Sequence, residues 1–312
     1  MNWDNKHGFT NQKLALNIDF EGKVEATLIS RKAKVQSKNA ILYIHGFVDY
    51  FFHDHLADWA NKIGFNFFAI DLRKHGRSIL PHQKPNMSRD LREYFEEIDM
   101  AINIIKKEND FLVLNGHSTG GLTSALYAHA NRNEKIIDGL ILNSPFFDFN
   151  KPAWFKNNIL PIVAKFGLKF PSLPSPEGLK SGYAKSLHKS HKGEWDFDFN
   201  YKPLKGFNIN FGWIAAIYYA QKNLQNGLDI NCPTLVMYSS NSVTPGNYNK
   251  KMHTADSVLE VADIERYADG IGSNVKKVEI KDGVHDLILS KKDVRDITFS
   301  EMTNFISTLK AK

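Results

Sequence analysis

Apolar residues along the chain follow two alternating patterns. Short runs of the kind that are buried on both faces of a sheet lie at residues 40–44, 65–70, 111–115 and 139–143, and residues 233–238 and 275–280 add two further strands. Apolar residues at helical spacing separate these strands, over residues 55–63, 89–107, 122–130, 211–224, 261–270 and 293–309. This order predicts βαβ crossovers, and therefore an α/β protein with a mainly parallel, twisted sheet flanked by helices.

Two parts of the chain depart from this order. Residues 14–20 and 24–30 alternate between apolar and polar positions around Glu21 and Gly22, which predicts a β-hairpin before the parallel sheet. Residues 145–226 contain prolines at 152, 161, 171, 174 and 176, and residues 146–219 hold 17 of the 38 aromatic residues. We predict a cap (lid) over an apolar pocket at residues 146–226, inserted between core parts at residues 1–145 and 227–312.

Composition limits the kinds of partner. Residues 151–205 contain ten lysines and four acidic residues, a balance of +6 that equals the formal net charge of the whole chain. No nucleic-acid-binding motif accompanies this charge, so a nucleic-acid partner is not expected. An anionic substrate or a membrane surface could use it, but a solvated basic face is the interpretation that the sequence favours.

The cellular compartment is also constrained. Cys232 is the only cysteine, so the chain has no internal disulfide and no thiolate metal cluster. The N-terminal residues lack the pattern of a signal peptide, and no run reaches the roughly 18 apolar residues of a membrane span. We expect a cytoplasmic enzyme without a metal or cofactor and without stable membrane insertion.

A serine between glycines follows one of the buried strands directly. Residues 116–120 read GHSTG and lead into an apolar-periodic helix. A tight turn from strand to helix has no room for side chains at Gly116 and Gly120, and it lifts the hydroxyl of Ser118 clear of the sheet. Ser118 is therefore the predicted nucleophile.

A serine hydroxyl needs a base, and the base needs an acid that orients it. Among the twelve histidines, His285 is the best candidate because it follows the last predicted strand, between Gly283 and Asp286. The loop after Tyr238, where the acid is expected, reads SSNSV and has no carboxylate. Asp256 lies 29 residues before His285, with room for one helix and one strand between them. We predict Asp256 as the acid, reached through an inserted excursion at residues 239–255.

Other carboxylates remain as alternatives for the acid. Asp263 is the main one, although its position also suits the N-cap of a helix, and that interpretation is the stronger of the two. Asp282 and Asp286 lie too close to His285 in sequence to be first choices.

The developing oxyanion requires two backbone N–H donors. Thr119 supplies one, because it follows the nucleophile at a helix N-terminus, and Phe47, directly after His45 and Gly46, supplies the other. His45 itself is expected to be a structural hydrogen-bonding group.

Four motifs together resemble the α/β-hydrolase superfamily: HGF at 45–47, DLRKHGRS at 71–78, GHSTG at 116–120 and GVHD at 283–286. Within it, the chain is similar to the monoglyceride lipase, lysophospholipase and serine aminopeptidase group. The resemblance implies an α/β-hydrolase fold, with Ser118 as nucleophile, His285 as base, and Phe47 with Thr119 as oxyanion hole. Lys74 departs from the pattern, because a glycine is common at its position.

The leading hypothesis is a serine hydrolase that cleaves a carboxylic ester of an apolar acyl group through an acyl-enzyme. The substrate would be a small-molecule ester, with lipid-derived esters as one class. An aminopeptidase-type amide hydrolase is the first alternative, and it would need a carboxylate in the cap, such as Glu177, Glu194, Asp196 or Asp198, to hold a free amino group. A non-catalytic protein that binds an acyl ligand is the second.

Overall fold

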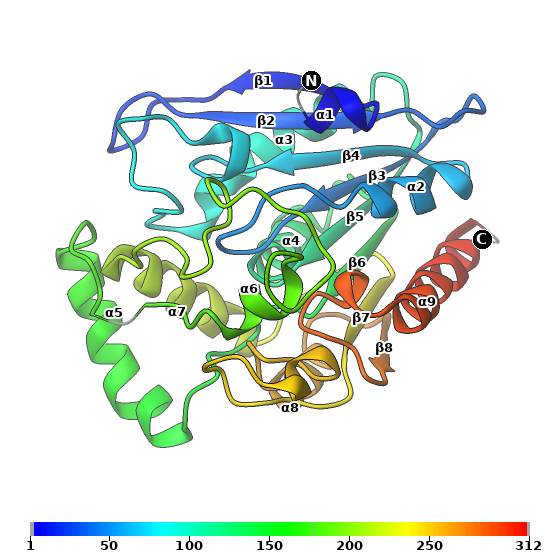
Figure 1. The fold of residues 1–312 in the computed structure, drawn as a ribbon. Coiled ribbons are helices and arrows are strands. Elements are labelled where there is room, and N and C mark those ends of the chain that lie inside the picture. The colour runs from blue at the N-terminus through cyan, green and yellow to red at the C-terminus, as the bar shows by residue number, and fades with distance from the viewer. Residues whose placement is uncertain (1–2, 177, 311–312) are drawn as a thin grey trace.

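The computed structural model describes residues 3–176 and 178–310, which build an eight-stranded sheet at the centre of the molecule (Figure 1). The strand order is β1-β2-β4-β3-β5-β6-β7-β8. The β1–β2 and β2–β4 pairs are antiparallel, and all pairs from β4–β3 to β7–β8 are parallel, so the predicted mainly parallel sheet is confirmed. The strands are β1 (Thr10–Ala15), β2 (Glu25–Arg31), β3 (Asn39–Ile44), β4 (Asn66–Asp71), β5 (Phe111–His117), β6 (Gly139–Asn143), β7 (Thr234–Ser239) and β8 (Val275–Ile280).

Helices cover both faces of this sheet. In the described ranges they are α1 (Trp3–Lys6), α2 (Asp54–Lys62), α3 (Phe95–Ile105), α4 (Thr119–Ala130), α5 (Leu160–Lys169), α6 (Gly182–Leu187), α7 (Phe211–Gln225), α8 (Val261–Ala268) and α9 (Lys292–Lys310). Helices α2 and α9 pack on one face, and α3, α4, α7 and α8 contribute to the core on the other (Figure 1). Strand β3 shows why two cores form: Ile41 and Tyr43 face one of them, and Leu42 and Ile44 the other.

The N-terminal hairpin is present, but its first strand, at residues 10–15, lies earlier in the chain than the predicted range of 14–20. Strand β1 ends at Ala15, and a separate bridge between Asp19 and Gly22 forms the turn. Asp19 and Glu21 turn toward the core because both carboxylates pair with the buried ammonium group of Lys74. These ion pairs draw residues 19–21 away from the line of the strand.

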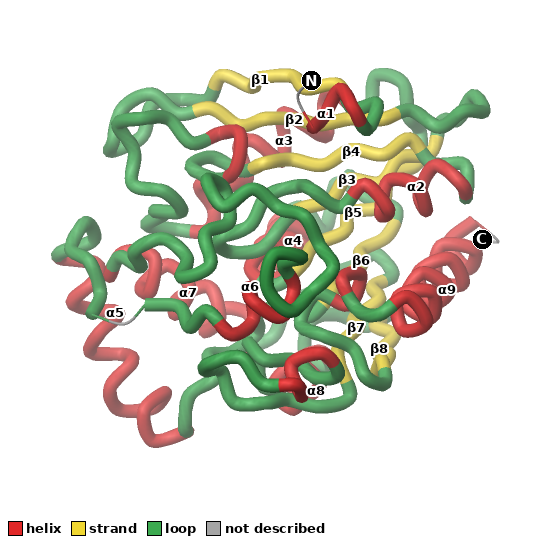
Figure 2. Tube along the Cα trace, in the orientation of Figure 1, coloured by secondary structure: helices red, strands yellow, loops and turns green. Residues whose placement is uncertain are grey.

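The long connection between β6 and β7 consists of helices and loops, without a regular strand in its described residues (Figure 2). A π-helical turn at Phe155–Ile159 leads into α5, which packs against α7. A Cβ atom on Gly167 would lie 2.2 Å from the carbonyl oxygen of Phe211, so glycine permits this close approach. Helix α5 was not predicted, because the prolines of this segment indicated only that it contains no long strand. Pro161 lies in the first turn of the helix, where proline is well tolerated. The division of the chain into a core and an inserted cap, with boundaries at residues 145/146 and 226/227, stays a prediction.

None of the helices in the described ranges combines the length and the apolar composition that a membrane span requires.

Candidate active site

Ser118 lies at the junction between β5 and α4, where the backbone is held in an unusual conformation. Its φ is 53° and its ψ is −117°, values that an L-residue rarely adopts. A Cβ atom on Gly116 would lie 2.5 Å from the carbonyl oxygen of Gly120, and one on Gly120 would lie 2.3 Å from that of His45. Both glycines are therefore required sterically, and the turn between them presents the serine hydroxyl at the carboxyl end of the sheet.

The structure brings Ser118, His285 and Asp256 together. His285 Nε2 lies 3.0 Å from Ser118 Oγ, and His285 Nδ1 lies 2.8 Å from Asp256 Oδ2. Because the carboxylate can only accept, Nδ1 donates to Asp256 and Nε2 accepts the serine proton, an assignment that rests on the hydrogen-bond network. Asp256 is fully buried, and its second oxygen accepts hydrogen bonds from the backbone N–H groups of Val258 and Leu259, at 2.8 Å each. These bonds hold the acid in a single orientation.

Asp256 reaches this position by the route predicted for it. The chain leaves the sheet after β7 and returns at Asp256, whose backbone N–H donates to the carbonyl oxygen of Asn241 at 2.8 Å. The carbonyl oxygen of Asp256 accepts from Val243 N–H at 2.7 Å, and a parallel bridge joins Ser242 to Asp256. Asp256 is therefore held beside the loop that follows β7, although it is 17 residues from the end of that strand in sequence.

Asp263 is not close to His285 in this arrangement. It lies in the first turn of α8, and its carboxylate pairs with Lys156 at 3.0 Å. The prediction that Asp263 is the N-cap was wrong: Glu260 occupies that position, and its side chain accepts from Ala262 N–H. Asp263 is the third residue of α8, where a carboxylate still interacts favourably with the helix dipole.

The backbone N–H groups of Phe47 and Thr119 are both available beside Ser118. Thr119 is the first residue of α4, so its N–H has no acceptor within the helix. Within residues 3–176 and 178–310, neither N–H group donates a hydrogen bond. Gly46 lies against Ser118, because a Cβ atom added to it would be 3.1 Å from Ser118 Cβ. The Phe47 ring stacks on Trp213 of α7 at a centroid distance of 3.9 Å, which fixes this loop against the β6–β7 connection.

His45 is a structural group, as expected. Its Nε2 accepts from Leu72 N–H at 3.1 Å, and its Nδ1 lies 2.7 Å from the carbonyl oxygen of Gly46. Burial lowers the pKa of His45, so the ring stays neutral and holds the loop that carries Phe47.

A cavity of about 560 Å³ opens onto Ser118 and His285. Its wall is mostly apolar and comes from the core, the β6–β7 connection and the loop after Asp256; the main apolar residues are Phe146, Phe149, Leu204, Ile209, Trp213 and Leu259. Asp49, His117 and Lys202 form a polar corner. Such a cavity suits a ligand with an apolar part and a polar end.

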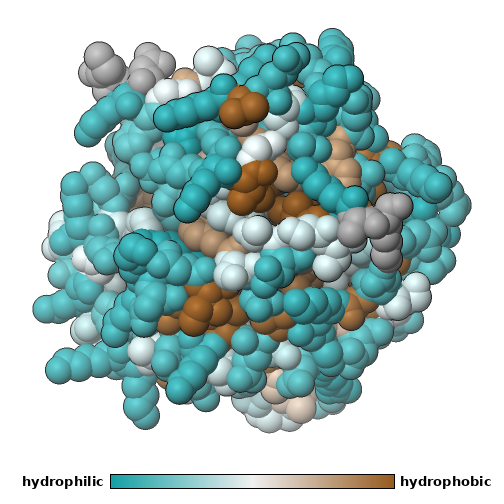
Figure 3. All heavy atoms as spheres, turned by 90° about the vertical axis from the view of Figure 1, so that its right-hand side faces the viewer, coloured by the Kyte–Doolittle hydropathy of each residue, from teal (hydrophilic) through white to brown (hydrophobic). Residues whose placement is uncertain are grey.

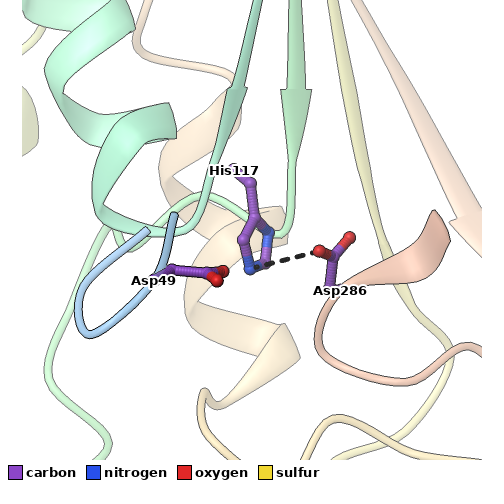
Figure 4. Close-up of side chains that lie close together, drawn as sticks. All are labelled: Asp49, His117 and Asp286. Carbon is purple, nitrogen blue, oxygen red and sulfur yellow. Dashed lines mark ion pairs between the residues drawn. The ribbon is translucent and has the colours of Figure 1, made fainter. Parts of the chain in front are cut away.

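The polar corner continues into a buried cluster that the sequence did not indicate. Asp49, His117 and Asp286 each place a polar atom within 4.8 Å of the other two (Figure 4). Lys202 Nζ lies 2.7 Å from Asp49, and His53 Nε2 lies 3.1 Å from Asp286. The three residues are close enough to share a cation, but these neighbours already supply positive charge or donors, and we assign no metal ion.

Asp286 anchors the loop that carries the predicted base. Its carboxylate accepts from Asn143 Nδ2 of β6 at 2.7 Å, and its backbone N–H donates to the hydroxyl of Tyr183 in α6 at 3.2 Å. Burial acts to raise the pKa of Asp286, yet contacts with His117 and His53 hold it well below its ordinary value. Burial lowers the pKa of His117 to about 4. The aspartate next to His285 in the GVHD motif was the only sequence signal for this role.

The loop after β4 is tied down by ion pairs. Asp71 pairs with Arg77 at 2.7 Å, and Arg73 pairs with Glu97 of α3 at 2.6 Å. Lys74 takes a positive φ of 62°, the conformation for which glycine is common at this position. Its fully buried ammonium lies 2.6 Å from Asp19 and 2.8 Å from Glu21, so the side chain compensates for the backbone cost.

Replacing Lys74 with methionine is expected to lower the free energy of unfolding by about 3–5 kcal/mol, because two nearly buried carboxylates lose their cation. Urea denaturation followed by circular dichroism measures the change. The Lys281→Met variant, at an exposed lysine, is the matched control and should change stability by less than about 0.5 kcal/mol. Equal stability of the two variants would show that the buried ion pairs contribute nothing net.

Comparison with known proteins supplies an independent line of information. The family model described as serine aminopeptidase, S33, matches residues 35–292. No curated protein matches the chain. Similar solved structures include a soluble variant of monoglyceride lipase from Saccharomyces cerevisiae in complex with a substrate analogue, with 17% identity, a TM-score of 0.70, and coverage of 96% of this chain and 95% of that one.

Two further structures are similar at the same level. The monoacylglycerol lipase of Paleococcus ferrophilus has 18% identity and a TM-score of 0.68, and the match covers 90% of this chain and 99% of that one. Est1E from Butyrivibrio proteoclasticus, solved with ferulic acid bound, has 17% identity and a TM-score of 0.60, with 96% and 100% covered. At these identities the likeness establishes the α/β-hydrolase fold.

Proposed function

Because the chain belongs to the serine aminopeptidase family S33 and is a serine hydrolase of the α/β-hydrolase superfamily, we propose that it cleaves carboxylic esters of apolar acids through a Ser118-His285-Asp256 triad. The observation that carries the proposal is the hydrogen-bonded line from Ser118 Oγ through both nitrogens of His285 to Asp256. Each atom in that line has the donor or acceptor role that nucleophilic catalysis requires.

The proposed reaction has two halves. Ser118 Oγ attacks the ester carbonyl carbon while its proton passes to His285 Nε2, and Asp256 stabilises the imidazolium that forms. The N–H groups of Phe47 and Thr119 donate to the oxyanion. Collapse of the tetrahedral intermediate expels the alcohol, which takes the proton from His285. Water, activated by the same base, then hydrolyses the acyl-enzyme.

The substrate is proposed to be a small ester with an apolar acyl group, of which a lipid-derived monoester is one class. The apolar wall of the cavity supports this assignment for the acid part, and the corner with Asp49 and Lys202 suits a polar alcohol part. Lipases acting on monoglycerides are among the structures that share this fold. The cytoplasmic location stays a prediction.

The aminopeptidase alternative has less support. A free amino group would need an unpaired carboxylate in the cavity, yet Glu194, Asp196 and Asp198 do not line it, and Asp49 is paired with Lys202. Glu177, the fourth acidic residue considered, lies outside the described residues. The non-catalytic alternative is weakened by the complete set of hydrogen bonds around Ser118.

A substrate panel tests the proposal. We expect the protein to hydrolyse p-nitrophenyl esters, with a higher kcat/KM for butyryl and octanoyl than for acetyl esters, because longer chains bury more apolar surface in the cavity. Leucine p-nitroanilide should be turned over at least about a hundredfold more slowly, since the described residues that line the site offer no unpaired carboxylate for the amino group. Faster anilide than ester turnover would favour the aminopeptidase, and tight acyl-ligand binding without turnover would favour the binding protein.

A further inference from the structure

Exposed apolar side chains are concentrated on one part of the molecule. Thirteen large hydrophobic residues of the described chain are exposed, and six of them lie within 17 consecutive positions. These six, which we call the apolar cap face, are Trp154, Ile159, Ile162, Phe166, Leu168 and Phe170. Ile162 is 65% exposed and Trp154 62%. Leu173 and Leu179 are also exposed and continue the series along the chain.

Packing within the cap does not explain this exposure. Helix α5 turns Leu160, Ala164 and Gly167, three residues at helical spacing, toward the protein. A surface helix normally turns its large apolar residues inward and its polar residues outward. Helix α5 buries Leu160 and two small residues, whereas its large residues Ile162 and Leu168 are 65% and 59% exposed. An apolar surface of this kind on a folded protein marks an interaction site.

The charges on the same stretch define the partner. Lys165, Lys169 and Lys180 are exposed, and none of them forms an ion pair with a described residue. Residues 151–180 contain five lysines and a single acidic residue, Glu177. Exposed tryptophan, isoleucine and phenylalanine combined with unpaired lysines match the chemistry of an anionic lipid surface, in which the apolar side chains enter the interface and the cations meet the head groups.

The position of the face also fits this partner. Lys151, Leu179 and Lys180, at the two ends of the stretch, line the cavity that opens onto Ser118. Helix α5 stands at the opposite side of the molecule from α9 (Figure 1). On the face around α2 and α9, hydrophilic side chains predominate and hydrophobic ones form separate patches (Figure 3).

We propose that the apolar cap face docks the protein reversibly on an anionic lipid surface, with α5 lying in the plane of the interface. Ten residues of α5 are too few to span a bilayer, so the docking is peripheral. The docking does not depend on ester chemistry. Only its consequence, delivery of a lipid-derived substrate from the surface into the adjacent cavity, rests on the proposed function.

Vesicle co-sedimentation of the Ser118→Ala protein measures docking without turnover. We expect binding to vesicles of phosphatidylcholine with phosphatidylglycerol, and weaker binding to phosphatidylcholine alone. The double variant Ile162→Glu/Leu168→Glu should bind at least about tenfold more weakly, because two apolar side chains no longer enter the interface. The matched control, Val35→Glu/Ile297→Glu, changes two exposed hydrophobic residues elsewhere and should bind like the parent.

The lysines and the tryptophan give two further readouts. Lys165→Gln/Lys169→Gln should reduce binding to the anionic vesicles about tenfold and leave the weak binding to phosphatidylcholine unchanged. Brominated lipids should quench part of the tryptophan fluorescence, and Trp154→Phe should remove that part.

Three results would overturn the proposal. The first is equal vesicle binding by the cap-face and control variants, and the second is no binding to either kind of vesicle. The third is a stable dimer that Ile162→Glu/Leu168→Glu dissociates, because a second copy of the chain would then be the occupant of this face. If the folded parent protein binds the vesicles but hydrolyses no ester, the proposed function is rejected and the docking remains intact.

Discussion

The Ser118→Ala variant is expected to lose about six orders of magnitude in kcat toward p-nitrophenyl butyrate. Removal of Oγ leaves His285 and the N–H groups of Phe47 and Thr119 in place but takes away the atom that forms the acyl-enzyme. Initial rates at saturating substrate, corrected for spontaneous hydrolysis, measure the loss. The fold should persist, because alanine meets the same backbone cost as serine at a φ of 53°.

The matched control is Ser257→Ala, a buried serine that also lines the cavity and has no partner for its hydroxyl among the described residues. This control should keep kcat within about threefold, the effect expected of a substitution that removes no reacting atom. A folded Ser118→Ala protein with more than a hundredth of the parent activity would exclude Ser118 as the nucleophile.

The Asp256→Asn variant is expected to lower kcat by about 10⁴-fold with little change in KM. The asparagine oxygen would keep the bonds from Val258 and Leu259 N–H, which turns its NH₂ group toward His285 Nδ1. His285 would then carry its proton on Nε2, where it could no longer accept from Ser118. Activity assays on variants with matched circular dichroism spectra measure this effect.

Asp263→Asn is the control that separates the two acids considered from the sequence. Asp263 pairs with Lys156, away from His285, so its replacement should leave kcat within about twofold, as for a substitution outside the site. A large loss in Asp263→Asn together with a small one in Asp256→Asn would reverse the assignment.

The main elements of the sheet could be predicted because their patterns depend on burial alone. Strands β3, β4 and β6 have continuous apolar central residues, and each strand lies within one residue of its predicted range. Helix α5 was missed because the prolines of its segment indicated only that the sheet pattern is interrupted there. Pro161 lies in the first turn of the helix, a position that suits proline.

The residues of the candidate site differ in the same way: some follow from short local motifs, and others depend on contacts between distant segments. Ser118 and His285 could be predicted from short motifs, because a tight turn and a strand end have local sequence requirements. The acid required an argument from spacing, since the chain returns to the end of β7 only through hydrogen bonds between Asn241, Val243 and Asp256. The cluster of Asp49, His117 and Asp286 joins three distant segments, and no local pattern could indicate it.

The central claim is that Ser118 is an activated nucleophile, and covalent labelling with a fluorophosphonate tests it most directly. Peptide mass spectrometry should find one phosphonylated serine, Ser118, in the parent protein, much slower labelling in Asp256→Asn, and none in Ser118→Ala. A folded parent protein that stays unlabelled, or that carries the label on another serine, would contradict the account.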